Sequence, residues 1–270
     1  SSGRSYILQF AGRTKTHVIM KDQSLYEYLL MLGDNSMILG HRLSELCGHG
    51  PSLETDIALT NISLDLFGQV RSYFQYAAEL KGDEATEDSI AFLRFDRDYR
   101  NSIIVEQPNT DFAHVIVRQF LFDSYHVPLL EQLMHSEDET IAAIAAKSIK
   151  EAKYHLRFSS EWMKRLGDGT EESHQRTQNA LNHLYPYLHE LYHESPIEKE
   201  MKDQGVGADL SVVKERSLET IKEVIAEATL SIPDSEPRMV RGKQGIHSEH
   251  MGFILSDLQF MQRAYPNMQW

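Results

Sequence analysis

The sequence contains a single cysteine, Cys47, among its 270 residues. One cysteine cannot form an internal disulfide, so we expect the chain to work in a reducing, cytoplasmic compartment. No apolar run approaches the roughly 20 residues that a membrane-spanning helix requires. No apolar core of a signal peptide is found either. The sequence therefore predicts neither a membrane protein nor a secreted one.

Basic residues are also scarce, with 27 Lys and Arg against 40 Asp and Glu and a net charge of −13. This acidic surplus argues against a general nucleic-acid-binding protein. The sequence has no phosphate-binding glycine loop, dinucleotide-binding fingerprint or hydrolase nucleophile elbow. The hydrophobic content of 41% and charged content of 25% are typical of a globular chain.

Strand patterns, internal repeats and low-complexity tracts are absent as well, and helical periodicity predicts an all-α fold. We predict long helices at 24–47, 52–80, 109–135 and 136–167, a short one at 87–94, and C-terminal helices at 171–193, from 195, at 211–229 and at 248–264. Residues 103–105 are predicted to be extended because they precede Pro108, and the loop 231–245 joins the last two helices.

Two capping boxes set the predicted starts of long helices. Ser24 precedes Glu27 by three residues, and Ser136 precedes Glu139 by the same spacing. Pro128 falls inside the helix 109–135 and predicts a kink. Residues 1–23 lack a clear period, so we expect a leader or an added extension there and a single domain over 24–270.

Each of the four long helices carries an acidic residue at a similar distance from its predicted start. These residues are Asp34, Asp65, Asp123 and Glu151. In an antiparallel bundle they are expected near the midplane. Buried carboxylates at one level repel each other, so protons, basic partners or metal ions must neutralise them.

A di-metal site in a four-helix bundle takes one carboxylate from each of two helices and a Glu-x-x-His pair from each of the other two. Here Gly68 and Tyr154 follow Asp65 and Glu151 by three residues, and the only pair with this spacing is Asp123-x-x-His126. Because two histidines are missing, the pattern favours a hydrogen-bonded polar layer. In that layer Asn61, Gln119 and His126 supply hydrogen-bond donors. Arg71, Arg118 or Lys153 supply positive charge. A metal site using Asp34, Asp65, Asp123, His126 and Glu151 stays open as the alternative.

Three other features are weaker candidates. His247 and His250 lie three residues apart at a predicted helix start, a spacing that could suit a metal. The segment Arg238–Lys243 is a basic loop in an acidic protein and could meet the phosphates of a ligand, including coenzyme A, or an acidic partner. Cys47 lies at a helix C-terminus, which does not activate a thiol.

Several segments together resemble the C subunits of bacterial phenylacetyl-CoA epoxidase complexes. The matching segments are LGDN at 32–35, CGHGPSLETDIALTNISLDLFGQVRSYFQYAAEL at 47–80, VEQPN at 105–109, KEAKYHLRFSSEWMKRLGDGT at 150–170 and GKQGIHSEHMGFILSDLQFMQRAYPNMQW at 242–270. The resemblance covers about residue 24 to the end.

The resemblance implies a ferritin-like four-helix bundle with additional C-terminal helices. It also implies a heteromeric complex in which a homologous catalytic subunit holds the di-iron centre, binds the coenzyme A thioester and epoxidises its aromatic ring. A separate reductase of the complex uses NADPH, FAD and an iron–sulfur cluster. This chain is then a structural subunit with no catalytic residue, cofactor or metal of its own.

For that role the sequence predicts an apolar contact surface with contributions from Tyr26, Leu30, Met37, Tyr73 and Tyr76. Without its partner, the chain is expected to self-associate through the same surface. Two alternatives stay open: an independently active di-metal oxygenase or oxidase with an unusual ligand set, and an iron-storage protein that forms a symmetric shell.

Overall fold

The computed structural model describes residues 5–82, 84–238 and 240–266, with side chains from residue 23 onward. Over these residues the chain is helical, and its only β-type pairing is one bridge between Arg241 and Ile246. The helices are α1 Ser5–Ser44, α2 Leu53–Lys81, α3 Glu87–Phe92, α4 Phe112–Leu133, α5 Glu139–Gly167, α6 Glu171–Leu184, α7 His189–Tyr192, α8 Pro196–Asp203, α9 Leu210–Glu227, α10 His250–Leu258 and α11 Phe260–Ala264. Short 3₁₀ helices are η1 Asp96–Asp98, η2 Ile103–Glu106, η3 Tyr185–Tyr187 and η4 Gly242–Gln244. The all-α prediction is confirmed.

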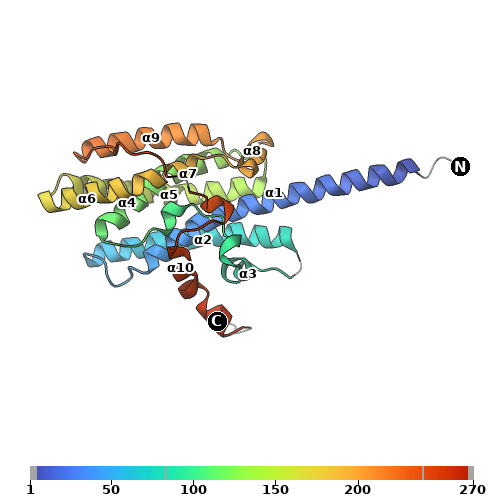
Figure 1. Ribbon diagram of the computed structural model, residues 1–270, viewed down its shortest axis with the longest axis horizontal. Helices are drawn as coiled ribbons and strands as arrows, with labels where there is room; N and C mark the ends of the chain where they lie inside the picture. Colours follow the sequence, from blue (N-terminus) through green and yellow to red (C-terminus); the bar gives the residue numbers. More distant parts are fainter. Residues whose placement is uncertain (1–4, 83, 239, 267–270) are drawn as a thin grey trace.

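A bundle of α1, α2, α4 and α5 forms the centre of the molecule (Figure 1). α1 packs along α2, α4 packs along α5, and α2 also contacts α5. Residues 82–111, which contain α3, η1 and η2, form the one long crossover between the two helical pairs. Two antiparallel pairs joined by one long crossover are the topology of the ferritin-like fold.

Helix α4 is the most deeply enclosed element because α5, α6 and α9 all pack against it. Its sequence is apolar on every side, as expected for a helix that is covered on every side. Pro128 lies inside α4, which continues to Leu133. The smaller helices α6 and α9 therefore complete the burial of α4.

The predicted start of the first helix at Ser24 is wrong. α1 begins at Ser5, and its first part extends beyond the bundle (Figure 1). Ser24 Oγ instead donates to Glu200 on α8 at 2.8 Å, and Glu27 accepts from Arg100 Nε at 2.8 Å. The capping-box residues thus make tertiary contacts, which local spacing alone does not reveal.

Other predicted boundaries shift for identifiable reasons. Asp138 caps α5 by accepting from the Ile141 N–H, while the hydroxyl of Ser136 donates to the Val206 carbonyl. The predicted extended segment 103–105 is the 3₁₀ helix η2. Pro186 interrupts the predicted helix 171–193, because proline lacks the N–H that a continuing helix needs.

The predicted contact surface on the first two helices is also corrected. Leu30, Met37 and Tyr73 are buried inside this chain, and Tyr26 and Tyr76 are half-buried. The three buried side chains stabilise the packing of the bundle itself, so they are not available to an external partner. No helix in the described part of the chain is long and apolar enough to span a membrane.

Candidate functional site

Asp123 on α4 lies in the middle of the bundle and is bound by uncharged groups. Gln119 Nε2 donates to its Oδ1 at 2.7 Å, and Ser159 Oγ from α5 donates to its Oδ2 at 2.8 Å. Burial raises the pKa of Asp123 to about 8, although both hydrogen bonds act in the opposite direction. Asp123 is therefore mainly protonated at neutral pH, and protonation rather than a basic side chain removes its charge.

His126 lies one turn along α4 from Asp123, and it is buried against the ring of Phe122 at a centroid distance of 5.0 Å. Burial lowers the pKa of His126 to about 3, with a smaller contribution from nearby His155. Its Nδ1 has no hydrogen-bond partner among the described residues. The imidazole is therefore neutral, and one of its nitrogens is left unsatisfied inside the protein.

His155 on α5 pairs across the bundle with Asp65 on α2. Its Nε2 lies 2.9 Å from Asp65 Oδ2, while its Nδ1 has no partner in the described part of the chain. Burial lowers the pKa of His155 more than Asp65 raises it. His155 was not predicted as a site residue because it follows Glu151 by four residues rather than three. Its place on the buried stripe of α5 was the signal that could have identified it.

The positions that a metal-binding relative would fill with histidine lie on the outside. Gly68 is exposed, with space around it for a larger side chain, and Tyr154 is 41% exposed. Glu151 is half-buried, and burial and the charge of Asp65 raise its pKa. A histidine at 68 or 154 would therefore lie on the surface. The residues of α2 and α5 that face the bundle interior are thus not the ones that the Glu-x-x-His spacing predicts.

Asp34 does not join the other acids, contrary to the midplane prediction. Arg94, at the end of α3, binds its carboxylate with both terminal nitrogens, and the Arg100 backbone N–H donates to Oδ2 at 2.8 Å. Burial alone would lower the pKa of Arg94, but Asp34 raises it above the ordinary value. Asp34 thus holds the crossover against α1.

The basic residues predicted to neutralise the acids bind other groups. Arg71 pairs with Glu87, Lys153 pairs with Glu131, and Arg118 donates to Gln107 and Asn109. Asn61, a predicted donor, is exposed. Arg94 binds Asp34 and Ser159 binds Asp123 instead. Neither was identified from the sequence, because each binds an acid that lies far away along the chain.

The bundle interior does not fit a di-iron ligand set. Within the described residues, no three His, Cys, Asp or Glu side chains converge in a way that could hold a metal ion. A di-iron site of this fold takes four carboxylates and two imidazoles. Here Asp34 is paired with an arginine, both oxygens of Asp123 accept hydrogen bonds from Gln119 and Ser159, and Glu151 is half-buried.

A second buried polar cluster lies where the crossover meets the C-terminal segment. Glu106 accepts hydrogen bonds from Asn101 Nδ2 at 2.8 Å, from His247 Nδ1 at 2.6 Å and from the Ser248 N–H at 2.9 Å. Both ring nitrogens of His247, the weak candidate for a metal pair with His250, are engaged, Nδ1 with Glu106 and Nε2 with the Tyr99 carbonyl at 3.1 Å. Of the resembling segments, VEQPN and GKQGIHSEH meet here.

The LGDN segment supports the same crossover. Asn35 Oδ1 accepts the Ser102 N–H at 2.8 Å, next to the Asp34–Arg94 pair. A side chain at Gly33 would overlap the ring of Phe74, so glycine lets α1 and α2 approach closely. Residues of the LGDN segment therefore shape the packing around the crossover and between α1 and α2.

The predicted basic loop is only partly available to a ligand. Lys243 is buried, where its Nζ lies 2.8 Å from Glu198 Oε1 and donates to the carbonyls of Leu191 and His193. Arg238 and Arg241 stay exposed. The loop therefore presents two positive charges rather than three.

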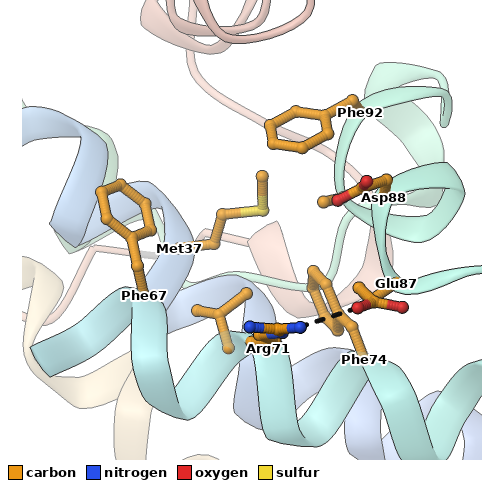
Figure 2. A pocket seen from close by; sticks show the side chains of 9 residues that line it. Met37, Phe67, Arg71, Phe74, Glu87, Asp88 and Phe92 are labelled. Carbon is orange, nitrogen blue, oxygen red and sulfur yellow. Dashed lines mark ion pairs between the residues drawn. The ribbon is translucent and has the colours of Figure 1, made fainter. Parts of the chain in front are cut away.

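A surface pocket of about 410 Å³ lies between α1, α2 and α3. Figure 2 shows the rings of Phe67, Phe74 and Phe92 around it, with Arg71 and Glu87 paired at 3.5 Å. The pocket contains none of the four predicted acids. Its apolar side chains can accept a hydrophobic group, and Arg71, Glu87 and Asp88 supply charges in its lining.

Comparison with known proteins gives two findings. A model of the phenylacetic acid catabolic protein family matches residues 11–270. The C subunit of the 1,2-phenylacetyl-CoA epoxidase of Escherichia coli strain K12 is 46% identical over 246 residues, which are 91% of this chain and 99% of that protein. The family match includes residues 11–23, which lie outside the resemblance carried by the sequence segments above.

Proposed function

Because the chain belongs to the phenylacetic acid catabolic protein family, we propose that it is a structural, non-catalytic subunit of a multicomponent di-iron oxygenase. That complex epoxidises the aromatic ring of phenylacetyl-CoA in aerobic phenylacetate degradation in the cytoplasm. The di-iron centre belongs to a homologous catalytic subunit, and NADPH, FAD and an iron–sulfur cluster belong to a reductase. This chain packs against the catalytic subunit and stabilises it.

An uncovered apolar face on α2 is the observation that carries the proposal. Leu53, Ile57 and Leu64 are 72%, 51% and 61% exposed, and they lie on the outward side of a helix whose inward side is buried. Tyr154 on the neighbouring α5 is also exposed, and it lines a groove together with Glu54 and Thr55 of α2. Large exposed apolar patches mark protein interfaces, and we call this set the α2–α5 face.

The groove beside this face adds aromatic and arginine side chains to the apolar patch. It measures about 340 Å³ and is lined by Phe158 and Trp162 together with the charged Arg157, Glu161 and Arg165. Aromatic and arginine side chains with an apolar centre are typical of binding hot spots. An obligate pair of subunits buries about 2,000 Å² or more of accessible surface in total, so the interface must extend beyond the three exposed side chains of α2.

The interior supports the same role. Buried acids that are protonated or paired with arginine cannot bind a metal without losing those interactions. The bundle keeps the shape of a ferritin-like oxygenase subunit while its polar interior is used for packing. In the alternative function, an independent di-metal oxygenase, Asp65, Asp123, His126 and Glu151 would have to rearrange to become ligands.

Co-purification tests the partner. We expect this chain, co-expressed with the catalytic subunit, to purify as a heteromer, and the double substitution Ile57→Asp and Leu64→Asp to abolish that complex because it places two charges in an apolar contact. The matched control is Ile232→Asp, a 42% exposed isoleucine in the loop after α9. Normal complex formation by the double variant would exclude the α2–α5 face.

Metal analysis tests the non-catalytic role separately. Protein produced alone in iron-rich medium is expected to contain far less than one iron per chain. About two irons per chain, with an absorbance that responds to oxygen, would refute the proposal and support an independent enzyme.

A further inference from the structure

The loop 231–245 forms one wall of a surface pocket of about 440 Å³ that is separate from the α2–α5 face. Its lining comes from η2, η3 and the start of the C-terminal segment: Ile103, Tyr187, Arg238, Val240, Arg241, Ile246, His247 and Ser248. We call it the Arg238 pocket. Its volume lies in the range of small-molecule sites.

The structure holds Arg238 in a defined position. Its backbone N–H donates to the Pro186 carbonyl at 3.0 Å, and its Nη1 donates to the Tyr187 hydroxyl at 3.0 Å. Its guanidinium carbon lies 4.9 Å from the centre of the Tyr187 ring. The remaining N–H groups of this exposed guanidinium have no partner among the described residues, so they are free to bind an anion.

Arg241 is fixed through its backbone while its side chain stays free. It forms the β-bridge with Ile246, and two residues later Lys243 anchors the loop in the protein through Glu198. The exposed Arg241 side chain makes no ion pair or hydrogen bond with any described residue. Two guanidinium groups are thus presented by a loop whose ends are held, which lowers the entropy cost of binding.

The carboxylates next to the pocket do not neutralise these arginines. Glu106 accepts from His247 and Ser248, and Glu190 accepts from the backbone N–H groups of Ile103 and Lys243. Burial alone would lower the pKa of His247, but its hydrogen bond with Glu106 raises it above the ordinary value. In a protein with a net charge of −13, this pocket therefore concentrates unpaired positive charge.

We infer that the Arg238 pocket binds the phosphate group of a small organic phosphate, with Arg238 and Arg241 gripping the anion. The planar guanidinium group of arginine can donate two parallel hydrogen bonds to two oxygens of one phosphate. The 57% exposed Ile246 and the half-buried Val240 line the rest of the pocket and offer an apolar contact for the organic part.

Calorimetric titration of the full chain at low ionic strength tests the inference, with pyrophosphate as the bare anion and ADP as an organic diphosphate. We expect one saturable site that both probes share. The double substitution Arg238→Ala and Arg241→Ala is expected to weaken binding at least tenfold. The matched control removes two exposed lysines of α9, Lys214→Ala and Lys222→Ala, and is expected to bind normally.

Three results would overturn the inference: no saturable binding, equal binding by the arginine double variant, or an equal loss in the lysine control, which would show general charge attraction. In the second of these cases, a pull-down assay with the catalytic subunit identifies the other role. If the arginine double variant binds pyrophosphate normally but no longer co-purifies with the catalytic subunit, the two arginines belong to a protein interface. Neither titration result bears on the iron content, so this test is independent of the proposed function.

Discussion

Two buried polar regions of the molecule accommodate buried acidic groups in opposite ways. Around the crossover, charged groups are retained and paired: Asp34 with Arg94, Lys243 with Glu198, and Glu106 with three donor residues. In the bundle centre Asp123 and His126 are mainly uncharged at neutral pH, because burial disfavours their charged forms. Asp123 is protonated there, and one nitrogen of His126 has no partner among the described residues.

The difference shows where buried charge stabilises this fold. Crossover residues connect segments that lie far apart in the sequence, and each charge there has a geometric partner. In the bundle centre, Asp123 has only hydrogen bonds from an amide group and a hydroxyl group. We therefore expect the two regions to respond differently to substitution and to pH.

Breaking the crossover pair should have the largest effect. Arg94→Met leaves Asp34 buried and unpaired, and we expect a loss of about 3–5 kcal/mol in the free energy of unfolding. Chemical denaturation measures this loss. Arg71→Met, which breaks the largely exposed pair with Glu87, is the control and should cost less than about 1 kcal/mol. Equal losses would remove the distinction between the buried and exposed pairs.

Substitution of Asp123 should have an intermediate effect that depends on the replacement. Asp123→Ala leaves Gln119 and Ser159 without an acceptor, and we expect a loss of about 2–4 kcal/mol at pH 6. Asp123→Asn keeps the shape and the neutral state, so the loss should be about 1 kcal/mol or less. Thermal and chemical unfolding of both variants provide the comparison, and equal losses would contradict a neutral side chain in the native protein.

The pH dependence of Asp123 follows from the same neutral state. The pKa of Asp123 is about 8 in the folded protein against an ordinary 3.8, so between these values the folded state binds a proton that the unfolded state has released. Stability from this group is therefore present at low pH and is lost as pH rises toward 8. Relative to Asp123→Asn, the wild type should lose about 1 kcal/mol or more between pH 5 and pH 8. A parallel pair of stability curves would show that Asp123 is ionised.

His126 should give the smallest effect, with the opposite sign. Its pKa of about 3 lies below the ordinary 6.5, so the unfolded state alone binds the proton between these values. The contribution of His126 to stability is present above pH 6.5 and is lost as pH falls toward 3. His126→Phe should change stability at pH 8 by about 1 kcal/mol or less and should lessen the decline below pH 6.5. An unchanged decline would mean that other groups cause it.

Local patterns determined much of the architecture. The periods of α2, α4 and α5 and the stop at Gly82 are visible in the sequence, because a helix depends on residues three or four positions apart. The buried stripe that carries His155 was visible for the same reason. The start of α1 was not, since Ser24 and Glu27 fit a capping box locally while their partners Glu200 and Arg100 lie elsewhere in the chain.

The sequence by itself determined the all-α class, the long helices and the presence of acids along the bundle, because these depend on composition and short-range spacing. Only the tertiary structure decided which acids keep their charge. Asp34 meets an arginine 60 residues away, whereas Asp123 meets an amide and a hydroxyl. Ionisation of a buried carboxyl depends on burial and on the groups that the whole fold brings to it.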